Sequence, residues 1–155
     1  MTSLKIRRLR ERDLPEMREA LKVLGDAFED PESYAGSPPD DAYLRNQLRE
    51  DRLIVLVALV ENQVVAGLIA HELPKLESPG REIYLYDLGV RKEWRRRGIA
   101  TALISSLQHI GSERGITGLY VQAEMEEDDQ PAIALYLQYT SPRQVLHFDL
   151  PIRKD

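Results

Sequence analysis

The hydrophobic positions of this chain follow two periods, one typical of strands and one typical of helices. A nearly continuous apolar run from 53 to 60 indicates a strand buried on both faces. The polar stretch at 61–63 is a plausible tight turn, which predicts a hairpin with the next apolar run. Strands are predicted at 5–9, 53–60, 64–71, 83–90, 118–123 and 144–150. Helices are predicted at 14–24, 43–48, 99–110 and 131–139.

The order of these elements predicts a mixed α/β fold. A strand is followed by two helices, three strands, a helix, a strand, a helix and a last strand, with no internal repeat and no linker between them. With 155 residues, the chain is long enough for one ordinary domain and too short for two comfortable ones. We therefore expect a single domain over residues 1–155.

Composition and charge narrow the class of protein and the kind of partner. Hydrophobic residues make up 43% and charged residues 30%, which is typical of a globular protein and not of a disordered one. The net charge of -5 argues against a nucleic-acid partner and is compatible with a cationic small molecule. No stretch approaches the ~18–20 apolar residues that span a bilayer, and the N-terminus lacks the apolar segment of a signal peptide. We expect a cytoplasmic protein with no membrane partner.

Cysteine and histidine usage gives no sign of a metal centre. The sequence has no cysteine, which excludes disulfides, thiolate metal sites and a cysteine nucleophile. His71, His109 and His147 lie far apart and show no ligand spacing. Each histidine is therefore expected to be a surface or core residue, and no metal is expected.

The strongest local signal lies at residues 95–101, between a predicted strand and a predicted helix. A turn with a glycine at this place exposes free backbone N–H groups at the helix N-terminus, where the helix dipole also favours an anion. Gly98 lets the backbone approach a phosphate without a side chain in between. Arginines at this end of a helix oppose the dipole, so Arg95, Arg96 and Arg97 indicate a bound anion; the alternative is a solvated basic patch.

These residues resemble a known motif. The pattern Arg95-x-x-Gly98-x-Ala100, after Tyr86-Asp87-Leu88-Gly89-Val90, resembles the acetyl-CoA motif of the GNAT superfamily, which is usually Arg/Gln-x-x-Gly-x-Gly/Ala. The element order also resembles the GNAT fold over nearly the whole chain. This resemblance implies a central, mostly antiparallel sheet that is splayed between its fourth and fifth strands and has flanking helices.

Within the superfamily, several segments resemble the aminoglycoside 3-N-acetyltransferases of the gentamicin-resistance type. These segments are 82–88, 97–104, 120–123, 134–136 and 147–149. The resemblance implies an enzyme that transfers acetyl from acetyl-CoA, by direct attack, to an amine of an aminoglycoside antibiotic. The 3-amino group is the expected acceptor, and resistance to the antibiotic is the expected consequence.

The resemblance also implies the residues that bind acetyl-CoA. Backbone N–H groups from about 96 to 101 would hold the pyrophosphate, and the strand that carries Gly89 would pair with the pantetheine arm. An amide N–H of that strand would polarise the thioester carbonyl, as in an oxyanion hole. The full set is Leu88, Gly89, Val90, Arg95, Arg96, Arg97, Gly98, Ile99, Ala100 and Thr101.

Tyr136 lies where related enzymes have the residue that protonates the departing thiolate. A phenol can donate to such a thiolate, whose acid is the stronger of the two. The alternative is a helix tyrosine that only packs its ring. The family commonly continues with Lys-x-Gly-Phe, whereas here residues 137–142 read Leu-Gln-Tyr-Thr-Ser-Pro, so the turn after the helix must differ.

Acidic residues supply what a cationic acceptor needs, namely a counter-charge and a general base. Asp87 interrupts an otherwise apolar strand, where an unpaired charge is costly, so it is either a substrate contact, a member of a buried ion pair or a residue that faces the sheet edge. Asp87 and Glu124 are the candidates for general base or amine anchor. The expected substrate-binding residues are Tyr34, Asp87, Glu124, Glu126, Glu127, Asp128 and Asp149.

Two other functions stay open at this point. The same enzyme class could act on another amine, such as a polyamine or a protein N-terminus. The altered segment after Tyr136 also fits a non-catalytic acyl-CoA-binding module. Relatives often form dimers, so a homodimer through the C-terminal strands is possible.

Overall fold

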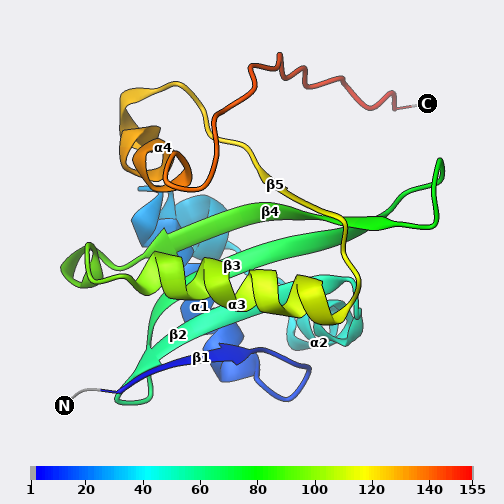
Figure 1. Ribbon diagram of the computed structural model, residues 1–155. Coiled ribbons are helices and arrows are strands. Elements are labelled where there is room, and N and C mark those ends of the chain that lie inside the picture. Colours follow the sequence, from blue (N-terminus) through cyan, green and yellow to red (C-terminus); the bar gives the residue numbers. More distant parts are fainter. Residues whose placement is uncertain (1–2, 155) are drawn as a thin grey trace. The chain divides into compact units, whose positions relative to one another are not determined.

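The computed structural model describes residues 3–154, which form two compact units, residues up to 122 and residues from 123 onward. The first unit holds a five-stranded sheet in the order β1-β2-β3-β4-β5 (Figure 1). The strands are β1 (Leu4–Arg8), β2 (Leu53–Val60), β3 (Gln63–Pro74), β4 (Arg81–Val90) and β5 (Gly118–Val121). β1 to β4 are antiparallel, and β5 runs parallel to β4. The mixed, mostly antiparallel sheet of the predicted fold is confirmed.

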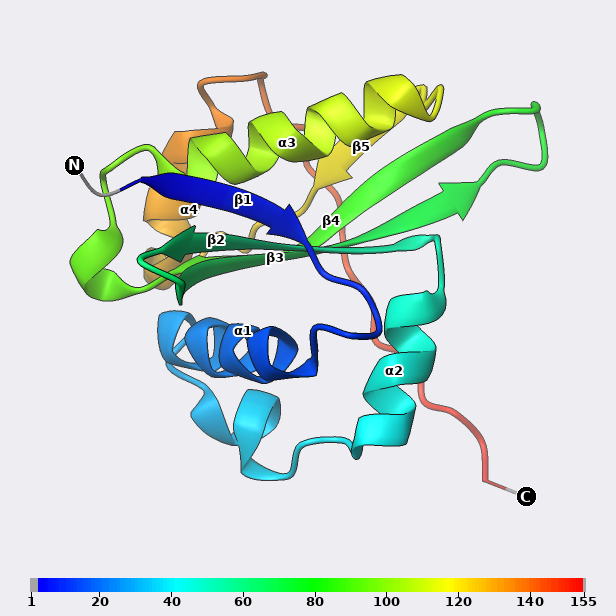
Figure 2. The same ribbon diagram turned by 90° about the horizontal axis from the view of Figure 1, so that it is seen from below.

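The helices of this unit cover both faces of the sheet (Figure 2). α1 (Leu14–Ala27) and α2 (Asp41–Arg49) lie on one face, and α3 (Ile99–Glu113) lies on the other. α1 is amphipathic. Its apolar side, with Met17, Ala20 and Val23 at helical spacing, is buried against residues of β2, and its polar side faces away from the sheet. The remaining short elements of the unit are a π-helical turn η1 (Glu32–Gly36) and a 3-10 turn η2 (Lys92–Trp94). No helix within residues 3–154 has the length and apolar character needed to cross a membrane.

The hairpin between β2 and β3 confirms the predicted tight turn. Glu61 and Asn62 have φ values of 49° and 65°, so both central residues adopt the left-handed conformation of a type I′ turn. β2 is buried from Ile54 to Val60, as expected for a strand with helices on both sides.

A bulge in β4 reverses the face on which later residues lie. Leu85 pairs with Ala70 and Asp87 pairs with Ile69, so Tyr86 is an extra residue without a partner in β3. In a regular strand, residues 85 and 87 would face the same side. Here Asp87 lies on the α1 face, where it contacts a residue of η1, whereas Ile83, before the bulge, lies under α3.

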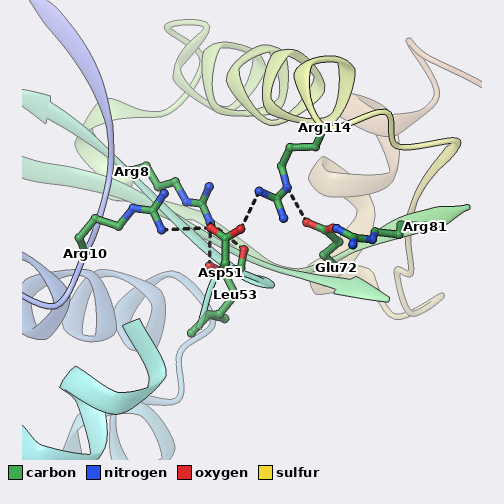
Figure 3. Close-up of polar contacts among 7 residues, drawn as sticks. All are labelled: Arg8, Arg10, Asp51, Leu53, Glu72, Arg81 and Arg114. Atoms are coloured by element: carbon green, nitrogen blue, oxygen red, sulfur yellow. Dashed lines mark hydrogen bonds and ion pairs between the residues drawn. The ribbon is translucent and has the colours of Figure 1, made fainter. Parts of the chain in front are cut away.

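An ion-pair network joins the end of α3 to the far end of the sheet (Figure 3). The carboxylate of Glu72 is fully buried and accepts hydrogen bonds from Nη1 of Arg81 at 2.8 Å and from Nε of Arg114 at 2.7 Å. Nη1 of Arg114 also donates to Asp51 at 2.8 Å, and Asp51 pairs with Arg8. Burial alone would raise the pKa of Glu72, but the two arginines outweigh it and lower that pKa.

The second unit contains a 3-10 turn η3 (Glu127–Asp129) and a short helix α4 (Gln130–Tyr136). Pro131 stands in the first turn of α4, where its fixed φ suits a helix start, and the helix predicted at 131–139 ends at Tyr136. The strand predicted at 144–150 is wrong, since the segment has no strand pairing and its side chains are exposed. The backbone N–H and C=O groups of a strand need hydrogen-bond partners in a neighbouring strand, and the apolar pattern of this segment does not supply them.

Candidate functional site

The N-terminus of α3 presents several backbone N–H groups that have no partner in the helix. Gly98 is the N-cap residue with φ 76°, and its carbonyl accepts the first helical bond, from the N–H of Ala102 at 3.0 Å. Within residues 3–154, no backbone carbonyl accepts from the N–H groups of residues 98–101. A Cβ atom at position 98 would meet nothing within 4 Å, so the space in front of these groups is open. This arrangement can bind an anion such as a phosphate.

The three arginines beside this helix end have different surroundings. Arg95 donates from Nε to the carbonyl of Val90 at 3.1 Å and from Nη2 to the carbonyl of Ala27 at 3.4 Å, so it ties the turn to β4 and α1. Arg96 has φ 60°, a conformation that costs a non-glycine residue roughly 1–2 kcal/mol. Arg97 lies over the ring of Trp94, with its guanidinium carbon 4.8 Å from the ring centroid. Arg96 and Arg97 are exposed and can reach an anion in front of the helix.

The sheet opens between β4 and β5 beside this turn. The two strands pair only from Glu82 with Gly118 to Leu85 with Val121, whereas β4 continues to Val90. The predicted splay is therefore confirmed. The edge of β4 beyond the bulge has no strand partner on that side within the described residues.

Two N–H groups of β4 point to this open edge. The N–H of Arg91 donates to the carbonyl of Val65 in β3. Because N–H directions alternate along a strand, the N–H groups of Leu88 and Val90 point away from β3. Gly89 lies between them, and a Cβ atom there would meet Cβ of Ala27 at 2.8 Å, so glycine is required for α1 to pack on β4. An extended ligand can pair with this edge as an added strand.

Asp87 lies beside the open edge on the α1 face. Its side chain is buried and accepts a hydrogen bond from the hydroxyl of Tyr34 in η1 at 3.0 Å. Burial raises the pKa of Asp87, while the bond from Tyr34 and the nearby His71 act in the opposite direction. The same contact and burial raise the pKa of Tyr34, which therefore remains a donor. The pairing of Tyr34 with Asp87 brings together two of the predicted substrate-binding residues.

A cavity of about 290 Å³ lies next to this pair, between the helices and the sheet. It is lined by apolar residues of α1, α2 and β2 and by a few polar side chains. Those polar residues include Ser33, Tyr34, Tyr43, Gln47 and His71. The cavity is suited to a small molecule with both apolar and hydrogen-bonding groups.

The second unit holds the other predicted site residues. Tyr136 ends α4, and burial together with the carboxylate of Asp129 raises the pKa of Tyr136 to about 12. The N–H of Glu124 donates to Asp129 at 2.8 Å, which orders the acidic turn. Asp149 lies 2.9 Å from Nε2 of His147 and raises the pKa of that histidine. The exposed acidic side chains of this unit are Glu124, Glu126, Glu127, Asp128 and Asp149.

Three aromatic residues and a histidine were not assigned a role from the sequence. His71, Tyr84, Tyr86 and Tyr120 come together across β3, β4 and β5. The signal in the sequence was the pair of tyrosines beside Asp87 in an apolar strand. Their contact with His71 and Tyr120 depends on strand register, which the sequence pattern does not determine.

Comparisons with known proteins agree with this geometry. The model of the Acetyltransferase (GNAT) family matches residues 17–139. An aminoglycoside acetyltransferase from an uncultured soil metagenomic sample is 45% identical, with a TM-score of 0.95 over 97% of this chain and 99% of the other. A second aminoglycoside acetyltransferase from such a sample, solved in complex with sisomicin, is 32% identical with a TM-score of 0.87 over 97% of both chains.

A further relative is named for an acceptor other than an aminoglycoside. The N-alpha-acetyltransferase of Saccharolobus solfataricus (strain ATCC 35092 / DSM 1617 / JCM 11322 / P2) is 31% identical over 96 residues, which are 57% of this chain. The match spans 56% of that relative. The family model, by contrast, extends from Met17, within α1, to Tyr139, beyond the end of α4. The splayed sheet, the glycine turn before α3 and this match agree: the chain belongs to the GNAT family of acetyltransferases.

Proposed function

We propose that this chain transfers an acetyl group from acetyl-CoA to an amine of an aminoglycoside antibiotic, with the 3-amino group as the acceptor, and thereby confers resistance. The observation that carries this proposal is the buried carboxylate of Asp87 beside the open edge of β4. The two structural relatives, named as aminoglycoside acetyltransferases, support the same acceptor class. Since acetyl-CoA is a metabolite of the cytoplasm, the proposal places the enzyme there.

The described residues fit acetyl-CoA at two places. The open N–H groups at residues 98–101, together with Arg96 and Arg97, suit a pyrophosphate. The free N–H groups of Leu88 and Val90 suit the amide groups of a pantetheine arm and the carbonyl oxygen of a thioester. Ile99, Ala100 and Thr101 belong to the same helix end, and Gly89 keeps β4 close to α1. Bound acetyl-CoA supplies the acetyl group as a thioester that an uncharged amine can attack directly.

The residues of the chain handle the protons of this reaction. Asp87 accepts a proton from the acceptor ammonium, since its raised pKa brings it closer to the operating pH than an ordinary aspartate. The freed lone pair forms the C–N bond as the C–S bond breaks, and the nitrogen then loses its second proton to solvent. Glu124 of the second unit is the other candidate base, and the acidic side chains of that unit attract the polycation.

Tyr136 is the proposed donor to the departing thiolate. With a pKa of about 12, its phenol keeps its proton at neutral pH. Full transfer to a thiolate of pKa near 8.5 is uphill by roughly 3.5 units, so Tyr136 acts chiefly by a hydrogen bond to the developing charge. Tyr136→Phe should lower kcat by about 10²-fold and leave acetyl-CoA affinity unchanged in calorimetry. Unchanged turnover would assign the ring a packing role only.

The acceptor is tested by following thiol release with purified enzyme and a panel of amines. Tobramycin, gentamicin and sisomicin represent the proposed class, and NMR of the product shows which nitrogen carries the acetyl group. Spermidine and a peptide with a free N-terminus represent the alternatives, the second of which is favoured by the N-alpha-acetyltransferase relative. Turnover with those amines and none with any aminoglycoside would overturn the proposal.

The remaining alternative is an acyl-CoA-binding module without catalysis. It predicts acetyl-CoA binding by calorimetry and no thiol release with any amine. For the proposed enzyme, expression in a susceptible bacterium should raise the inhibitory concentration of the antibiotic that is the best substrate in vitro. A variant without activity should not raise it.

A further inference from the structure

Four rings form a continuous aromatic row, which we define as His71, Tyr86, Tyr84 and Tyr120. His71 meets Tyr86 edge to face, with ring centroids 5.6 Å apart. Tyr86 meets Tyr84 in the same way at 5.6 Å. Tyr84 stacks on Tyr120 with centroids 4.8 Å apart and planes 7° apart. The row therefore crosses three strands of the sheet without a gap.

Strand register explains how the row forms. His71 pairs with Tyr84, and Tyr84 pairs with Tyr120, so three rings lie side by side on adjacent strands. Tyr86 is the extra residue of the β4 bulge, and its ring fills the place between His71 and Tyr84. The other face of these strands carries Ile83, which lies under α3. The row thus lies on the face of α1 and α2, beyond the part that these helices cover.

The aromatic row does not belong to the hydrophobic core. Tyr86 is 59% exposed and Tyr120 is 38% exposed. The hydroxyl of Tyr84 donates to Oε1 of Gln122 at 3.0 Å, whereas the hydroxyl of Tyr86 has no partner among the described residues. Contiguous exposed rings of this kind are typical of a binding surface. Tyr84 thus supports the row, and Tyr86 is free to contact a ligand.

The aromatic row lies next to the carboxylate of Asp87 and to the cavity that Tyr34 lines. Asp87 follows Tyr86 in the chain and carries the buried carboxylate held by Tyr34. His71, at one end of the row, also lines the 290 Å³ cavity together with Tyr34. A ligand on the row therefore meets π faces and one carboxylate within a short span of β4.

This combination selects one chemistry of ligand. The faces of aromatic rings attract ammonium groups and cover the apolar C–H side of a saturated ring. The Asp87 carboxylate attracts an ammonium group at the edge of that ring. A flexible linear amine supplies the charge but has no ring face to cover. A neutral sugar supplies the ring but gains nothing from the carboxylate.

We propose that the aromatic row, and Tyr86 above all, binds the face of an amino-substituted saturated ring and so positions one of its amines at Asp87. This inference rests on the proposed function and specifies how the acceptor is recognised. It makes Tyr86 a specificity-determining residue and not a catalytic one. The row should therefore affect the affinity for aminoglycosides much more than the chemical step.

The test compares Tyr86→Leu with Tyr86→Phe, because the first removes the ring and the second removes only the hydroxyl. Calorimetry of tobramycin binding in the presence of CoA, and the KM for tobramycin, are the two readouts. We expect Tyr86→Leu to weaken both by about tenfold, and Tyr86→Phe to stay within about threefold of the unaltered enzyme. Acetyl-CoA affinity and the melting temperature should not change, because Tyr86 is exposed and lies outside the pairing of β3 and β4.

A second acceptor separates ring recognition from charge. For spermidine, which has no ring, the Tyr86→Leu effect should be smaller than for tobramycin. Tobramycin affinity unchanged in Tyr86→Leu would overturn the inference while leaving the proposed function intact. Absence of aminoglycoside turnover by the unaltered enzyme would instead overturn the proposed function.

Discussion

The pKa of Asp87 is raised by its burial, and the hydroxyl of Tyr34 and the neighbouring His71 counteract that rise only in part. A carboxyl whose pKa is higher in the folded than in the unfolded chain destabilises the fold when it ionises. Stability is therefore lost as the pH rises from the unfolded value, near 3.9, through the folded value of Asp87. The ionised side chain of Asp87 thus destabilises the fold, and its proposed role as a base gives a reason for its presence.

Asp87→Asn should separate these two effects. The amide oxygen can still accept from Tyr34, so the local structure is kept, but the amide cannot accept a proton from the substrate. We expect kcat/KM to fall by about 10²–10⁴-fold, and the melting temperature at pH 8 to stay the same or rise. Steady-state kinetics and calorimetric melts measure the two quantities.

The matched control is Glu113→Gln, which removes the same charge from the exposed end of α3. Its activity should equal that of the unaltered enzyme. A melting temperature of Asp87→Asn several degrees lower would show that the carboxylate is structural and would contradict the assignment. An activity of Asp87→Asn equal to that of the control would contradict it as well.

At the scale of elements, the glycine turn before α3 offers a direct test of the diphosphate site. Gly98 and Gly115 flank the same helix, both have positive φ, and a Cβ atom on either would meet nothing within 4 Å. An alanine at either place therefore costs a similar strain of about 1 kcal/mol. Only Gly98→Ala should weaken CoA binding, by tenfold or more in calorimetry, because only its Cβ stands before the open N–H groups. Equal CoA affinity in the two variants would show that the diphosphate does not bind at this turn.

The ion-pair network fixes the other end of α3. Glu72→Gln should lower the free energy of unfolding by about 2–4 kcal/mol, since it leaves two arginines without their buried counter-charge. The pKa of Glu72 is lowered in the folded state, so this stabilisation is complete above the unfolded value, near 4.3, and is lost as the pH falls through the folded value. Urea unfolding should therefore show a larger difference between Glu72→Gln and the unaltered chain at pH 7 than at pH 3.5.

Glu77→Gln provides the comparison for that experiment. Glu77 pairs with Lys75 at 3.4 Å on an exposed loop, so its variant should unfold like the unaltered chain at both pH values. If Glu72→Gln also unfolds like the unaltered chain at pH 7, the network does not hold α3.

The sequence pattern predicted most elements because their apolar periodicity is strong. It placed β2, α3 and the turn at Gly98 within a few residues, and it indicated that Asp87 interrupts an apolar strand. It did not predict the bulge at Tyr86, because residues 83–90 were predicted as one regular strand. The extra residue shifts the apolar positions of β4 from Ile83 and Leu85 to Leu88 and Val90. The contact of Arg95 with the carbonyl of Ala27 was also out of reach, because the two residues are 68 positions apart in the sequence. The strand predicted at 144–150 has no neighbouring strand to pair with, and the sequence pattern does not show whether one is available.

At the scale of the whole molecule, the C-terminal segment 145–152 is notable for its exposed apolar side chains and its unpaired backbone. Its apolar side chains are exposed, and its backbone pairs with no strand of the described residues. The exposed apolar residues are Val145, Leu146, Phe148, Leu150 and Ile152. Exposed apolar side chains grouped in one segment are typical of an interface between copies of a chain.

We expect two copies to associate through this segment. Light scattering after size exclusion should give a mass near twice 17.8 kDa at micromolar concentration. Leu146→Asp combined with Leu150→Asp should give the monomer mass, because buried charges at an interface are costly. Leu76→Asp changes an even more exposed leucine, in the β3–β4 loop, and should leave the mass unchanged. A monomer mass for the unaltered chain would contradict the expectation.

The single added residue in β4 has a wider consequence for the shape of the sheet. An edge that holds one residue more than its neighbour must curve, and the pairing of β4 with β5 stops at Leu85, directly before that residue. Deleting Tyr86 should let the backbone run straight, so that the ladder with β5 could extend and close the gap into which a thioester would fit. The variant would then be unable to bind acetyl-CoA between β4 and β5, although every acid, arginine and glycine of the site would still be present.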